Sequence, residues 1–112
     1  MRVLWFLARV GVMLLVISGK TVAWAQTDSA QIAKGEKVYG DKKCAVCHAI
    51  KGKGGKVGPD LSAVGAKREA QWLEAFLKDP KASNPKGKMM PFKGSDEELE
   101  ALVTYLRSLK CS

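Results

Sequence analysis

Residues 43–48 read Lys-Cys-Ala-Val-Cys-His, and this short stretch constrains the chain more than any other segment. Two cysteines separated by two residues can form a thiol redox couple, supply half of a zinc site or attach a haem. A structural disulfide between Cys44 and Cys47 would close too small a loop to add much stability. The neighbouring residues, beginning with His48, must decide between a thiol redox couple, a zinc site and haem attachment.

His48 favours haem attachment. The Cys-x-x-Cys spacing presents both thiols on one side of a single turn, and a histidine directly after them can bind the iron. A zinc site would need a second Cys or His pair, but Cys111 is the only other cysteine and His48 is the only histidine. A thioredoxin-like couple would need a βαβ pattern, which the sequence does not show. We therefore predict one covalently bound haem c at Cys44, Cys47 and His48.

The first 25 residues differ in character from the rest of the 112-residue chain. They combine two early arginines, an apolar run from Val10 to Ile17 and an Ala-Trp-Ala sequence that ends at Ala25, with no acidic residue. This pattern predicts a secretory signal peptide over residues 1–25, cleaved after Ala25. The apolar run falls short of the roughly 20 residues that span a bilayer, so an uncleaved tether is the less favoured alternative. Residues 26–112 then form a single exported domain.

Helical patterns dominate this domain. Apolar spacing predicts a helix over residues 29–40, capped by Asp28 or Ser29, and another over residues 68–77 with Trp72, Leu73, Phe76 and Leu77 on one face. The last helix starts at Ser95, which forms a capping box with Glu98, and runs to Leu109.

Two long loops separate these helices, over residues 51–61 and 80–94. Both are rich in glycine and proline, so we expect no regular element to persist in the first of them. Long irregular segments are unusual in a domain of this size unless they wrap something. The pattern therefore predicts an all-α fold completed by a large buried cofactor.

Four segments in this order resemble the small class I c-type cytochromes of bacterial periplasms: GEKVYGDKKCAVCH, GPDL, KMMPF and SDEELEALVTYLRSLK. The resemblance covers residues 31–110. It implies the cytochrome c fold, with three to five short helices and long loops around one covalent haem c. It also implies a periplasmic one-electron carrier with His/Met axial ligation, which shuttles electrons between partner proteins and is not an enzyme.

The resemblance assigns further residues. Pro59 is similar to the proline whose carbonyl accepts a hydrogen bond from the haem histidine, which would fix the ring and raise its basicity. Gly35 and Tyr39 resemble the positions where the first helix crosses the last one closely. Leu102 and Tyr105 are the corresponding positions on the last helix.

The sixth iron ligand implied by the resemblance is Met89 or Met90. Related cytochromes often have a proline directly after the ligand, which favours Met90. The spacing to Phe92 and to the helix cap at Ser95 favours Met89 instead. Because the loop must cross the haem from a fixed helix start, we predict Met89 and keep Met90 as the alternative.

Sixteen Lys and Arg and eleven Asp and Glu follow Ala25. Eight of the lysines flank the cysteine motif or the methionine loop: Lys42, Lys43, Lys51, Lys53, Lys56, Lys86, Lys88 and Lys93. If these lysines surround the haem edge, they would steer the carrier to acidic docking surfaces on redox partners. Otherwise they are solubilising charge. We expect a monomer that binds neither nucleic acid nor a small-molecule substrate.

Two other functions stay open at this point. A haem sensor or peroxidase would need an exchangeable sixth position on the iron. A subunit bound permanently to a larger oxidoreductase would have the same sequence chemistry as a free carrier. Cys111 lies beyond the last apolar helix position, so we predict that it is exposed and dispensable for redox function.

Overall fold

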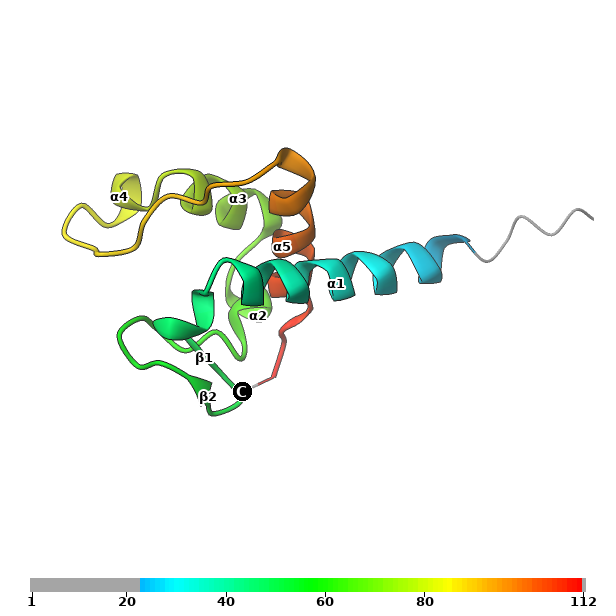
Figure 1. The fold of residues 1–112 in the computed structure, drawn as a ribbon, viewed down its shortest axis with the longest axis horizontal. Helices are drawn as coiled ribbons and strands as arrows, with labels where there is room; N and C mark the ends of the chain where they lie inside the picture. The colour runs from blue at the N-terminus through cyan, green and yellow to red at the C-terminus, as the bar shows by residue number, and fades with distance from the viewer. Residues whose placement is uncertain (1–22, 112) are drawn as a thin grey trace, which may run out of the picture.

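The computed structural model describes residues 23–111 and is mostly helical, as predicted (Figure 1). Most of the predicted signal peptide, residues 1–22, lies outside the described residues. No helix within the described range is both long enough and apolar enough to span a membrane. The elements in chain order are α1 (Ala23–Asp41), the 3-10 turn η1 (Cys44–Val46), β1 (Ala49–Ile50), β2 (Lys53–Gly54), α2 (Val64–Lys67), α3 (Ala70–Lys78), α4 (Pro80–Ser83) and α5 (Asp96–Ser108).

The crossing of α1 and α5 organises the fold (Figure 1). Gly35 lies at this crossing, where a Cβ would overlap the carbonyl oxygen of Ala101 and lie 2.5 Å from Cβ of Tyr105. The rings of Tyr39 and Tyr105 meet edge to face with centroids 5.8 Å apart. The predicted close helix contact is therefore confirmed, although Ala101, and not Leu102, provides the nearest backbone atoms.

The core lies between α1, α3 and α5. Its buried apolar residues are Val38, Tyr39, Leu73, Leu77, Leu99, Ala101, Leu102, Val103 and Leu106. On α3, Leu73 and Leu77 are buried while Trp72 and Phe76 are only half-buried. The predicted apolar face of this helix is correct, and its outer half stays available to contact something other than the protein core.

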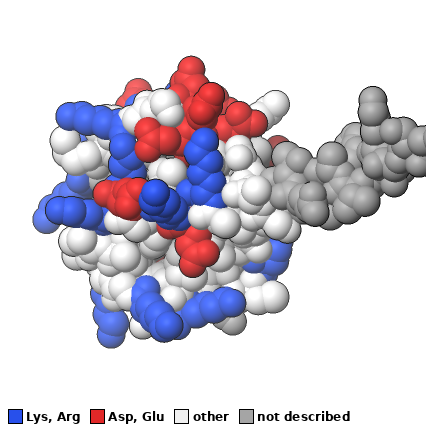
Figure 2. Space-filling view, turned by 45° about the vertical axis from the view of Figure 1, so that its right-hand side comes forward, with Lys and Arg blue, Asp and Glu red and all other residues white. Residues whose placement is uncertain are grey.

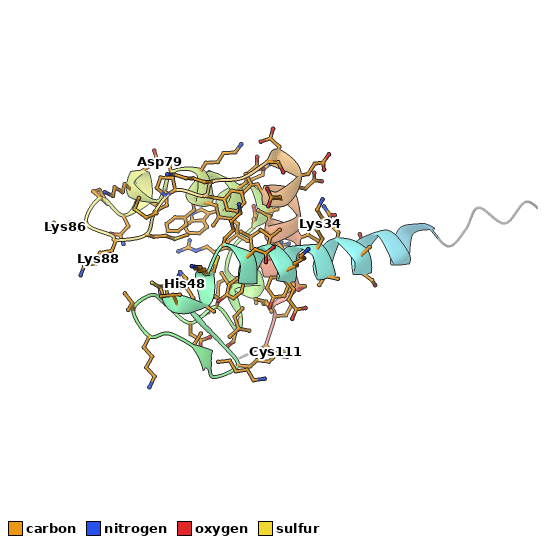
Figure 3. The ribbon with its side chains drawn as sticks, viewed as in Figure 1. Lys34, His48, Asp79, Lys86, Lys88 and Cys111 are labelled. Atoms are coloured by element: carbon orange, nitrogen blue, oxygen red, sulfur yellow. The ribbon has the colours of Figure 1, made fainter. Side chains whose placement is uncertain are left out.

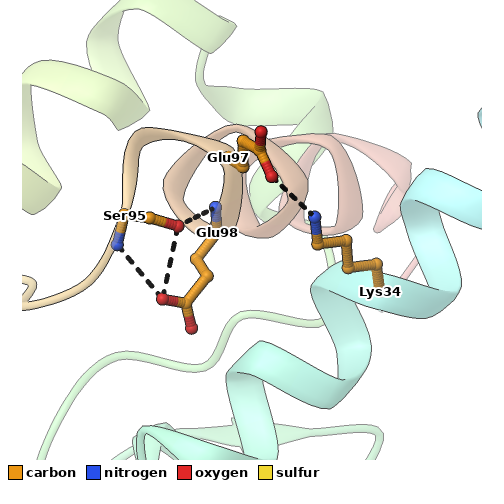
Figure 4. A network of polar contacts seen from close by, with 4 residues as sticks. All are labelled: Lys34, Ser95, Glu97 and Glu98. Carbon is orange, nitrogen blue, oxygen red and sulfur yellow. Dashed lines mark hydrogen bonds and ion pairs between the residues drawn. The ribbon is translucent and has the colours of Figure 1, made fainter.

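A capping network fixes the start of α5 (Figure 4). Ser95 Oγ accepts a hydrogen bond from the Glu98 N–H at 3.1 Å, and Glu98 Oε1 accepts one from the Ser95 N–H at 3.1 Å. That backbone N–H holds the pKa of Glu98 below its ordinary value. Lys34 of α1 pairs with Glu97 at 3.7 Å. The predicted capping box is present, and it sets where the preceding loop must end.

Two predicted helix starts are wrong. The first helix begins at Ala23, so neither Asp28 nor Ser29 caps it, since no glycine or proline interrupts residues 23–29. The second begins at Ala70, because Arg68 has an extended backbone at the end of α2. Pro80 does stop α3 but also opens α4, consistent with the tolerance of the first helical turn for proline.

A short hairpin over residues 49–54, which the sequence did not suggest, extends into the predicted loop over residues 51–61. Ala49 pairs with Gly54 and Ile50 with Lys53, in antiparallel register. Lys51 (φ 50°) and Gly52 (φ 79°) make the turn, since two consecutive left-handed residues match the twist of a two-residue hairpin. The expectation of no regular structure here was therefore wrong over a short stretch.

Candidate haem-binding site

The cysteine motif forms a tight turn directly after α1. Lys43 takes a left-handed backbone (φ 59°) that turns the chain out of the helix and into η1. The N–H groups of Cys47 and His48 both donate to the carbonyl of Cys44, at 3.2 and 3.0 Å. Cys44 and Cys47 are half-buried. Because both thiols belong to one short turn, they can bond to a single planar group.

Burial raises the pKa of the Cys44 thiol above its ordinary value. A thiol–disulfide couple needs a cysteine whose pKa is lowered, so that the thiolate is populated near neutral pH. The surroundings of Cys44 do the opposite. This environment disfavours the redox-couple interpretation of the motif.

His48 is oriented by the loop that follows the hairpin. Its Nδ1 lies 2.8 Å from the carbonyl oxygen of Pro59. A carbonyl only accepts hydrogen bonds, so Nδ1 carries the proton and donates, and Nε2 keeps its lone pair. This is the tautomer that a metal ligand requires, because the coordinating nitrogen must be unprotonated.

Glycines let this loop approach the motif closely. A Cβ at Gly58 would lie 2.5 Å from Cε1 of His48 and 2.7 Å from Nδ1. The Gly58 N–H donates to the Cys47 carbonyl at 2.6 Å, and the Gly55 N–H donates to the Ala45 carbonyl at 2.8 Å. In the sequence these glycines indicate only a loop, although their position directly after the motif is a usable signal of close approach.

Ser62 and Asp60 were also missed. Ser62 is the buried polar residue of the described chain, at 4 % exposure. Its Oγ accepts from the Lys51 N–H at 2.7 Å, and its own N–H donates to Asp60 Oδ1 at 2.8 Å. The Ser62 side chain, and then its backbone N–H, hold the pKa of Asp60 below its ordinary value, so this carboxylate is ionised at neutral pH.

The two candidate methionines have opposite exposures. Met89 is half-buried and packs against the hydrophobic core, whereas Met90 is 68 % exposed. The loop is tied to α3 by Phe92, whose N–H donates to the Leu77 carbonyl at 2.7 Å. The ammonium of Lys42 lies 5.5 Å from the centre of the Phe92 ring and pairs with Glu98 at 3.7 Å, so it joins this loop to α5.

Two aromatic side chains on α3 stack on each other. Trp72 and Phe76 stack with ring centroids 4.9 Å apart, and the Arg68 guanidinium lies 4.0 Å from the Trp72 ring centre. Both rings are half-buried. The donor set of two thiols and one imidazole in the cysteine motif fits a haem.

The comparison with known families decides the cofactor. Residues 32–110 match the family described as Cytochrome c. The chain belongs to the cytochrome c family. This cytochrome is therefore an electron-transfer haem protein of the class I c type, and its Cys44 and Cys47 have the spacing that carries one covalently bound haem c. The predicted fold is confirmed with it.

Several characterised proteins are similar to this cytochrome. Cytochrome c2 from Rhodospirillum rubrum is 35% identical, over 83% of this chain and 95% of that protein. Cytochrome c oxidase subunit 2 from Alkalihalophilus pseudofirmus is 33% identical, but the match covers 79% of this chain and only 31% of the relative. The menaquinol:cytochrome c reductase cytochrome c subunit from Bacillus subtilis is 33% identical, over 87% and 44% of the two chains. The cytochrome thus spans less than half of the oxidase and reductase subunits that it matches.

A solved structure supports the same fold. The crystal structure of the c-type cytochrome SorU from Sinorhizobium meliloti superposes with a TM-score of 0.57 at 25% identity. The match covers 74% of this chain and 97% of that one.

Cys111 is exposed at the end of the chain, as predicted. In Figure 3 it lies on the side of the hairpin, well away from the loop that carries Lys86 and Lys88. It therefore stands apart from the methionine loop.

Proposed function

We propose that this cytochrome is a periplasmic carrier of single electrons whose haem is attached through Cys44 and Cys47, with the iron held between His48 and Met89. The observation that carries the proposal is the orientation of His48, whose Nδ1 lies 2.8 Å from the Pro59 carbonyl oxygen, which leaves Nε2 as the nitrogen that would bind iron. The haem supplies the one-electron couple of its iron. The residues around it determine how strongly each oxidation state is held and which proteins can approach.

His48 and Met89 would shift the reduction potential in opposite directions. The hydrogen bond to the Pro59 carbonyl makes the imidazole a stronger donor, which favours the oxidised iron. A methionine sulfur is a soft, uncharged ligand and raises the potential. Two protein ligands leave no open position on the iron, so oxygen or peroxide would have nowhere to bind. This combination suits electron transfer without a bound substrate, and it disfavours a sensor or peroxidase.

The half-buried position of Met89 supports it as the sixth ligand over exposed Met90. The test is a matched pair of variants, Met89→Ala and Met90→Ala. We expect Met89→Ala to lose the weak far-red charge-transfer band that reports sulfur on oxidised iron, and to bind carbon monoxide when reduced. Met90→Ala should keep the band and exclude carbon monoxide. The opposite pattern would assign the ligand to Met90.

Covalent attachment is tested separately. Acid–acetone should leave the haem on the wild type, because thioether bonds do not break under these conditions. Cys44→Ser and Cys47→Ser should each still hold the haem through the remaining thioether bond, and only the double variant should release all haem. Retention of covalent haem by the double variant would contradict the assignment of both cysteines.

Charge distribution supports docking through the haem side. On the face shown in Figure 2, several acidic side chains gather at the top and others lie near the middle, while lysine and arginine side chains predominate along the left side and at the bottom. Lys86 and Lys88 lie at the outer turn of the methionine loop (Figure 3) and are exposed. Their placement favours acidic docking surfaces on redox partners.

The reaction rate with a redox partner tests this steering. Charges on the surface are screened over about 8 to 10 Å at 0.1 to 0.15 M salt, so the second-order rate should fall as salt rises. Lys88→Gln should reduce the rate and its salt dependence. Lys34→Gln removes the same charge on α1, away from Lys86 and Lys88 (Figure 3), and should change both less. Equal effects of the two variants would assign the lysines to general solubility.

A permanent subunit is the second candidate. It is favoured by the relatives named as an oxidase subunit and a reductase cytochrome c subunit. Cell fractionation followed by size-exclusion chromatography separates the two functions. A free carrier elutes from the periplasmic fraction as a monomer that begins at Gln26. A permanent subunit elutes with a larger oxidoreductase.

A further inference from the structure

Buried Ser62 and exposed Asp60 are hydrogen-bonded to each other, directly after the proline whose carbonyl accepts from His48. Ser62 is almost fully buried, and its Oγ accepts a hydrogen bond from the Lys51 N–H at 2.7 Å. The Ser62 N–H donates to Asp60 Oδ1 at 2.8 Å. A side-chain oxygen that accepts from the N–H two residues later makes an Asx turn, which restricts the backbone of Asp60. The first bond ties Ser62 to the tip of the hairpin, and the second fixes residues 60–62 relative to each other.

The same segment carries the acceptor for His48. The loop runs beside the motif, with the Gly58 N–H on the Cys47 carbonyl at 2.6 Å and the Leu61 N–H on the Ala49 carbonyl at 2.9 Å. The Pro59 carbonyl lies between these two anchors and belongs to the peptide unit that joins Pro59 to Asp60. The orientation of this peptide unit depends on two backbone angles, ψ of Pro59 and φ of Asp60. A turn that restricts the backbone of Asp60 therefore also restricts where the carbonyl points.

We propose that Asp60 and Ser62 are positioning residues that hold the Pro59 carbonyl against His48 and thereby set the reduction potential. The proposal rests on the proposed function, in which His48 binds the iron. A strong hydrogen bond from Nδ1 makes the imidazole a better donor and stabilises the oxidised state, and such hydrogen bonding is one of the controls on haem potential. Loosening the Asx turn lets the carbonyl rotate away, so the potential rises.

The Asp60 position offers a matched pair of variants. Asp60→Asn and Asp60→Ala remove the same negative charge from an exposed position, but only the asparagine keeps an oxygen that can accept from the Ser62 N–H. The loss of the negative charge changes the potential equally in both variants. The difference between their reduction potentials therefore measures the effect of the Asx turn alone. Ser62→Ala removes the second bond without a change in charge, and Ser83→Ala, at an exposed serine of α4, is its control.

The experiment measures potentials by redox titration and the exchange of the His48 Nδ1 proton by NMR. We expect the reduction potential of Asp60→Ala to be higher than that of Asp60→Asn by roughly 28 mV. This corresponds to about a threefold change in the redox equilibrium, at about 59 mV per tenfold for one electron. The reduction potential of Ser62→Ala should rise by a similar amount. The His48 Nδ1 proton should exchange faster in Asp60→Ala and in Ser62→Ala than in the wild type. Ser83→Ala should match the wild type.

Two outcomes would overturn the proposal. Equal potentials for Asp60→Ala and Asp60→Asn, with Nδ1 exchange unchanged, would mean that the Pro59 carbonyl keeps its position without the turn. A loss of stability in Ser62→Ala at unchanged potential would make Ser62 a purely structural residue. The wild-type spectrum tests the underlying function independently, because a protein without histidine-ligated haem would fail before any variant is compared.

Discussion

Gly35→Ala should open the crossing of α1 and α5. The new Cβ would overlap the Ala101 carbonyl oxygen and lie 2.5 Å from Cβ of Tyr105, whereas Cβ contacts below 3.0 Å essentially never occur. Both neighbours are backbone or near-backbone atoms of α5, so a change of side-chain rotamer cannot relieve the overlap. The two helices must therefore move apart, and the fully buried Ala101 and Leu102 lie at that interface.

The cost follows from two opposing effects. Forcing a methyl group into a well-packed core costs typically about 1 to 3 kcal/mol, and a rigid backbone on both sides places this site near the upper value. Alanine in a helix is favoured over glycine by about 1 kcal/mol, which offsets part of the loss. We expect a net destabilisation of about 2 kcal/mol, which lowers Tm by roughly 8 to 16 °C for a domain of this size.

Guanidinium unfolding of the haem-loaded protein, followed by helical circular dichroism, measures this change. Gly40→Ala is the matched control, because Gly40 lies in the same helix and a Cβ there meets nothing within 4 Å. That variant should be stabilised by up to about 1 kcal/mol. If Gly35→Ala unfolded at the same midpoint as Gly40→Ala, the close crossing would not be under steric constraint and the reasoning would fail.

Three further outcomes are expected. Gly58→Ala should push the His48 ring from its position, since the Cβ would lie 2.5 Å from Cε1, and it should lower the unfolding free energy by about 1 to 3 kcal/mol in urea titrations. Burial raises the pKa of Tyr39 to about 12, above 10.0, so the stabilisation from its neutral phenol is complete below pH 10 and is lost as pH rises through 12. In Tyr39→Phe the denaturant midpoint should fall less between pH 10 and pH 12 than it does in the wild type. An equally steep fall in the variant would mean that other groups cause the loss of stability. Ser95→Ala should cost about 1 kcal/mol through loss of the cap, and Ser95→Asp should retain most of that stability.

The sequence alone determined the features that depend on residues close together in the chain. Cys44, Cys47 and His48 share one turn, so their spacing was enough to predict a covalent haem. The Ser95 capping box spans four residues, Ser95 to Glu98, and was predicted for the same reason. The apolar face of α3 followed from helical periodicity over nine residues.

The tertiary structure decided what depends on distant segments meeting. Met89 and Met90 are chemically identical neighbours, and their different exposures result from the path of a loop that Phe92 ties to Leu77. The β1–β2 hairpin is too short for an alternating pattern to reveal it. Ser62 looked like an ordinary loop serine until folding placed its hydroxyl on Lys51, eleven residues away. Local spacing is encoded directly in the chain, whereas burial and long-range hydrogen bonds arise only from the packing of the whole domain.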